Sequence, residues 1–77
     1  MAETHELERA RQELGLSMGA LWIRYFGLGG MRDPLEVEAV LFGALVADVE
    51  DLDLLAVALN ERFSELGRDH PLPYSDD

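Results

Sequence analysis

Residues 39–47 form a run of nine residues, AVLFGALVA, without a polar side chain, and a chain of 77 residues has only one core in which to bury it. The run follows residues 33–36 (DPLE), where an aspartate cap, a proline at the first helical position and a glutamate predict a helix start. We therefore expect a helix over residues 34–46 that is buried on most sides. Gly43 would lie inside it, at a close crossing with another helix.

Three further helices are expected over residues 4–14, 18–26 and 49–66, with Thr4 and Ser17 as the N-caps of the first two. Because no segment alternates cleanly between polar and apolar residues, no strand is predicted. The predicted fold class is all-α, a compact bundle of four short helices. In it the third and fourth helices form an antiparallel hairpin, the first two pack across them, and the first is peripheral. The residues expected in the core are Leu21, Trp22, Phe26, Val40, Leu41, Ala44, Leu45, Leu55, Leu59 and Phe63.

The chain is expected to form a single helical domain over residues 1–67, followed by an extended, proline-containing acidic tail over residues 68–77. Two uses of this tail are open. Leu72 and Tyr74 can fold back to cover an edge of the core, or the segment can serve as a linear motif for a partner.

The net charge of −10 is unevenly distributed. Residues 1–32 balance four arginines against four acids, whereas residues 33–77 carry two arginines and twelve acids. Such a chain repels phosphates and anionic membrane surfaces, so nucleic acid and membrane are not the expected partners. The start of the chain is acidic and no apolar run approaches the length of a membrane span, which predicts a cytoplasmic protein.

Carboxylates are abundant, but the sequence shows no motif typical of catalysis or of metal binding. The chain has no cysteine, and its two histidines, His5 and His70, lie near opposite ends. None of the three serines is in a nucleophile motif, and the acids at residues 48–53 lack the glycine and spacing of a calcium loop. We therefore expect no catalytic residue, metal or cofactor, and the chain is not expected to be an enzyme.

Residues 9–21, with Leu-Gly-Leu-Ser at residues 14–17, resemble the start of the helix-turn-helix of lambda-repressor-like regulators. The resemblance implies the alternative function, a small DNA-binding transcriptional regulator that uses the corner at residues 9–26. The chain then departs from that pattern, since the next helix carries Glu36 and Glu38 where a recognition helix carries polar and basic side chains.

The segments LWIRYFGLGG, PLEVEA, ALNER and PYS are together similar to a small all-helical domain of actinobacterial signalling and regulatory proteins. The similarity extends over residues 7–75. It implies a bacterial regulatory context and binding to proteins, with no catalytic residues to transfer.

The leading hypothesis is a non-catalytic regulatory module for protein–protein interaction, with an apolar, aromatic helical surface and a strongly acidic C-terminal half. Its partner would be another protein or a second copy of the chain in a homodimer. The aromatic residues around Trp22 allow two interpretations, ordinary core or exposed anchors. The expected partner-binding residues are Trp22, Tyr25, Leu28 and Tyr74 as apolar contacts, with Arg24 and Arg32 as charges at the rim.

Overall fold

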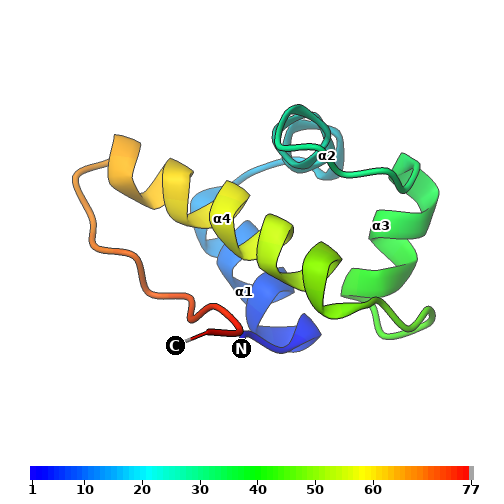
Figure 1. Cartoon of the computed structure of the whole chain (residues 1–77). Coiled ribbons are helices and arrows are strands. Elements are labelled where there is room, and N and C mark those ends of the chain that lie inside the picture. The colour runs from blue at the N-terminus through cyan, green and yellow to red at the C-terminus, as the bar shows by residue number, and fades with distance from the viewer. Residues whose placement is uncertain (77) are drawn as a thin grey trace.

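The structure is a computed structural model that describes residues 1–76 and contains four helices and, within that range, no strand (Figure 1). These are α1 (Thr4–Leu14), α2 (Met18–Gly27), α3 (Pro34–Leu41) and α4 (Val49–Glu65). The longest helix, α4, crosses the molecule, and α1 and α2 each pack against both α3 and α4. The predicted all-α bundle of four short helices is confirmed. None of the helices within residues 1–76 combines the length and apolar character that a membrane span requires.

The starts of two helices are those that the sequence predicts, because Ser17 Oγ and Asp33 Oδ1 accept backbone N–H bonds at 3.0 and 2.8 Å. The predicted bounds of α1, residues 4–14, are confirmed, but its predicted N-cap, Thr4, is wrong. Its N-cap is Glu3, whose N–H donates to Glu6 Oε1 at 3.1 Å, and Thr4 is the first helical residue. A capping box needs an acid three residues after the cap, and only a start at Glu3 supplies one.

The prediction that the third helix continues to residue 46 is wrong. The helix α3 ends at Leu41 because Gly43 adopts a left-handed φ of 77°. The N–H groups of Gly43 and Ala44 return to the carbonyls of Val40 and Ala39 at 3.0 and 2.8 Å, which is a Schellman ending. Gly43 therefore ends a helix, and the predicted close crossing is wrong, since a Cβ at this position would have nothing within 4 Å among residues 1–76.

The expected antiparallel hairpin of the last two helices is also wrong, since α3 packs against α1 and α2. The first helix is not peripheral, because Leu7 is fully buried where α1 crosses α4. Its apolar stripe is thin, but the small Ala10 beside Leu7 is buried as well and allows the two helices to approach closely.

The core agrees with the sequence-based expectation in six of ten positions, namely Leu21, Val40, Leu41, Leu55, Leu59 and Phe63. Three expectations are wrong, because Phe26, Ala44 and Leu45 are exposed; Trp22 is half-buried. On α2, Tyr25 is buried in the core of the protein, and its neighbour Phe26 is exposed. The helix α2 is apolar on nearly all sides, so its sequence does not show which side turns inward.

The C-terminal segment folds back onto the bundle, as one of the two interpretations predicts. Leu72 is buried, and both of its backbone polar groups bond to the buried side chain of Asn60, at 2.9 Å from Nδ2 and 3.2 Å to Oδ1. Tyr74 is half-buried, and its hydroxyl accepts a second bond from Asn60 Nδ2 at 2.8 Å. The N–H of Ala2 donates to the carbonyl of Pro73 at 3.1 Å, which joins the two ends of the described chain.

The predicted and the observed role of Gly43, inside a helix and at its end, imply opposite effects of Gly43→Ala on the free energy of unfolding. If Gly43 ends α3, Gly43→Ala places a side chain at positive φ and lowers the free energy of unfolding by about 1 kcal/mol or more. Inside a helix the same change would raise it by up to about 1 kcal/mol. Gly19→Ala, at an open position within α2, is the matched control and should stabilise the protein. Urea denaturation of both variants measures the two signs.

Candidate functional site

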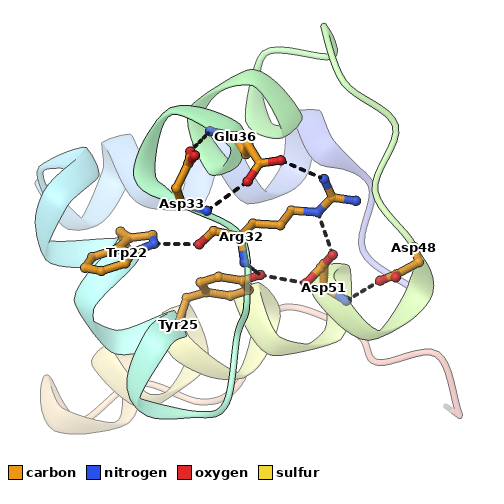
Figure 2. A network of polar contacts seen from close by, with 7 residues as sticks. All are labelled: Trp22, Tyr25, Arg32, Asp33, Glu36, Asp48 and Asp51. Carbon is orange, nitrogen blue, oxygen red and sulfur yellow. Dashed lines mark hydrogen bonds and ion pairs between the residues drawn. The ribbon is translucent and has the colours of Figure 1, made fainter.

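The most connected polar group of the structure is a network around Asp51, in the first turn of α4 (Figure 2). The Tyr25 hydroxyl, on α2, donates to Asp51 Oδ1 at 2.6 Å, and Arg32 Nε donates to Oδ2 at 2.7 Å. The Tyr25 hydroxyl also accepts from the backbone N–H of Arg32 at 3.1 Å. We call these three residues the Asp51 network. It joins α2, the segment that leads to α3, and α4.

The glycine-rich segment after α2 is what allows Arg32 to reach Asp51. Gly29 turns the chain with a φ of 101°. Gly30 is buried with its backbone against the ring of Tyr25, and a Cβ at this position would overlap the ring atoms. Glycine is therefore required at residue 30 for a close approach and at residue 29 for its conformation.

The same segment fixes an aromatic pair on α2. Trp22 Nε1 donates to the carbonyl of Arg32 at 2.9 Å, so the indole is held by the backbone that the Asp51 network holds (Figure 2). The Trp22 ring stacks on Phe26, with centroids 5.1 Å apart and an interplanar angle of 22°. The orientation of the half-buried Trp22 indole, on which the exposed Phe26 ring stacks, is thus tied to the Asp51 network.

The electrostatics of the network favour one set of protonation states. Burial raises the pKa of the Asp51 carboxyl, but the hydrogen bonds from Tyr25 and Arg32, with the charge of Arg32, outweigh burial and lower it below its ordinary value. Burial and the bond to Asp51 both raise the pKa of the Tyr25 hydroxyl. At neutral pH the network therefore holds a carboxylate, a guanidinium and a neutral phenol. Each carboxylate oxygen of Asp51 already accepts a hydrogen bond. The network is therefore better suited to holding α2, the turn after it and α4 together than to transferring a proton.

The six residues expected to bind a partner are in three different places. Trp22, Tyr25 and Arg32 come together in and around the Asp51 network, and Leu28 is half-buried in the turn beside them. Arg24 and Tyr74 lie elsewhere, on Glu65 and Asn60 respectively. Tyr25 is fully buried, so it offers no surface to a partner.

Arg24 forms a two-pronged ion pair with Glu65 near the end of α4, at 2.8 and 2.9 Å. Arg62 donates to the same carboxylate at 3.0 Å. The hydrogen bonds from Arg24 and Arg62 lower the pKa of Glu65 to about 2. The only charged side chain of α2 is therefore neutralised by α4.

Several large apolar side chains of α2, the following turn and α3 are exposed, and the sequence did not indicate this. Ile23 and Phe26, on α2, are 66% and 59% exposed, and Met31 and Leu35, in the turn and in the first turn of α3, are 93% and 77% exposed. We call Trp22, Ile23 and Phe26 the α2 face. The one available signal was that a helix with a single charge is too apolar to be buried on every side in so small a protein.

Two groups of potentially reactive side chains occur away from the network. Ser64 Oγ and His70 Nε2 are 2.5 Å apart, a contact the sequence did not predict; both residues are exposed and close the turn into the tail. At the start of α1, ligand atoms of Glu3, His5 and Glu6 lie within 4.8 Å of one another, but the two carboxylates cap the helix. Neither group lies in an enclosed site.

The helix-turn-helix-like corner of residues 9–26 consists of α1 and α2. Arg11 Nε and Nη2 donate to the carboxylate of Glu8 at 2.7 and 2.6 Å, and its Nη1 donates to the carbonyl of Leu16 at 2.8 Å. Arg11 therefore fixes the turn between the helices. Together with the pairing of Arg24, this leaves exposed Arg9 as the arginine of the corner for which the described contacts give no partner.

The close approach at residue 30 predicts a large effect of a small substitution. Gly30→Ala should lower the free energy of unfolding by about 2 kcal/mol or more, because the Tyr25 ring is fully buried and held by two hydrogen bonds. Gly27→Ala, three residues earlier with open space around it, should change it by less than about 1 kcal/mol. Equal effects in urea denaturation would contradict the packing described here.

The lowered pKa of Asp51 predicts a dependence of stability on pH. A carboxyl whose pKa is lower in the folded state stabilises the fold above its unfolded value of about 4, and this contribution is lost as the pH falls through the folded value. At pH 7, Asp51→Asn should therefore cost about 1–3 kcal/mol, and the difference from the wild type should shrink below about pH 4. Urea denaturation between pH 7 and pH 2 measures it, with Glu50→Gln, exposed in the same turn, as the control.

In comparisons with protein-family models, with curated proteins and with solved structures, the chain matched none of them.

Proposed function

We propose that this protein is a non-catalytic regulatory module that binds another protein through the α2 face. The observation that carries the proposal is the exposure of Ile23 and Phe26 beside Trp22 on a helix whose single charge is already paired. A group of large apolar side chains exposed to water is typical of a surface that a partner protein covers. Aromatic residues, tryptophan above all, contribute much of the binding energy where proteins meet.

Two side chains of the α2 face are also held in place in the absence of a partner. The Trp22 indole is fixed by its hydrogen bond to Arg32, and Phe26 is stacked upon it. Side chains that are already ordered lose little conformational entropy on association, so more of the burial energy becomes affinity. Leu28 stays a predicted apolar contact, and Arg24 and Arg32 stay predicted charges at the rim, with their guanidinium groups held by Glu65 and Asp51 respectively.

The regulatory and bacterial setting of the proposal, and its place in the cytoplasm, rest on the resemblance and composition described above. The alternative, DNA binding through residues 9–26, stays a prediction. The ion pairs of Arg11 and Arg24 favour protein binding over contacts with phosphate groups, since guanidinium groups already held by carboxylates gain less from a second anion.

The proposal is tested by substituting one side chain of the α2 face. Phe26→Ser should leave the fold intact, because the side chain is mostly exposed, and should abolish the capture of partners from an extract of the source cells. Leu66→Ser, a half-exposed apolar residue just after α4, is the matched control and should capture the same proteins as the wild type. Circular dichroism checks that both variants are folded.

Two results would decide against the proposal. One is an identical set of captured proteins for the wild type and Phe26→Ser. The other is salt-sensitive binding of duplex DNA by the wild type that is lost in Arg9→Ala, which would favour the alternative.

A further inference from the structure

A second exposed apolar surface lies between α3 and α4, well away in sequence from the α2 face. Phe42 and Val46 are 61% and 91% exposed, and Leu45 and Val49 are also exposed. We call residues 42–49 the α3–α4 segment. It leaves α3 at Gly43 and reaches α4 at its cap, Asp48, without forming a helix of its own.

The surroundings of this segment are acidic. Residues 33–61 contain eight acids and no lysine, arginine or histidine. Glu38, one helical turn before Phe42, and Asp48 and Glu50, at the start of α4, are exposed. The arginines that come near from other elements are themselves held by carboxylates, and the charge of Arg32 also acts on Asp48. Arg32 is held by Asp51 and approaches Glu36 at 3.8 Å, and Arg11, which senses the charge of Glu38, is held by Glu8.

Exposed apolar side chains surrounded by acids favour some binding partners over others. A second copy of the chain would bring two molecules of charge −10 together through an acidic surface, and like charges that face each other oppose such a contact. A partner with apolar side chains on one side and basic side chains around them would cover the apolar residues and neutralise the acids together. The described residues offer no strand edge for an extended peptide, so a helix is the form that satisfies its own backbone.

We propose that the α3–α4 segment is a docking surface for a basic amphipathic helix of a partner protein. The apolar side of that helix covers Phe42, Leu45, Val46 and Val49, and its lysines or arginines meet Glu38, Asp48 and Glu50. The surface shares no residue with the α2 face, so this inference stands or fails independently of the proposed function.

The experiment titrates the isotopically labelled full chain with a synthetic amphipathic helix of leucine and lysine and follows its amide NMR signals. Signals of residues 42–50 should shift, and those of residues 22–26 should not. Val46→Ser should weaken binding about tenfold, which is the contribution of one well-buried valine. Leu66→Ser, a half-exposed apolar residue that belongs to neither proposed surface, is the matched control and should bind as the wild type does.

Two further peptides separate this proposal from simpler attraction. A helix of leucine and glutamate should not bind, and an unpatterned peptide of lysine and serine should bind more weakly and lose its binding as salt is added. The inference is overturned if the lysine–serine peptide binds as tightly as the amphipathic helix. It is also overturned if Val46→Ser has no effect, if the shifts fall outside residues 38–50, or if light scattering shows a dimer that Val46→Ser dissociates.

Discussion

The carboxylate of Asp51 is the interaction on which the arrangement of the other elements depends. Helix α2 and the turn after it carry few charges, and apolar packing alone would leave their rotation about α4 poorly defined. The bonds from Tyr25 and Arg32 to one carboxylate select a single arrangement, since burying a phenol and an aspartate is favourable only when both are paired. The turn then delivers Asp33 to cap α3 and the carbonyl of Arg32 to hold Trp22.

Much of this fold could be predicted from local signals. The caps Ser17 and Asp33 depend on neighbours within a few residues, and the structure has them as expected. The choice between Tyr25 and Phe26 for the core could not be predicted, because it depends on a partner, Asp51, that is 26 residues away in the chain. A helix that is apolar on every side leaves that choice to tertiary contacts.

Two further differences have the same origin. The composition of residues 39–47 suggests a buried helix. Gly43 instead takes a left-handed conformation, and residues 42–46 are exposed to solvent. Asn60 sits on the apolar stripe of α4, one residue from Leu59, where an amide is unexpected. The Asn60 amide forms hydrogen bonds with the backbone of Leu72, and these bonds form only when the tail folds back onto α4. For the candidate site, the sequence named Trp22 and Arg32, which lie in and around the Asp51 network, but it did not indicate which neighbouring apolar side chains are exposed.

The hydrogen bond between Ala2 and Pro73 has a consequence for how the fold can be connected. The start of the chain lies beside the C-terminal tail in Figure 1. Because the beginning and the end of the described chain meet, a short linker can join them without disturbing α1 or the tail. The chain can then be opened at the α3–α4 segment, which is exposed and irregular. The order of the helices along the chain is thus separable from their packing. A domain built in this way can also be inserted into a surface loop of a larger protein, since its entry and exit lie side by side.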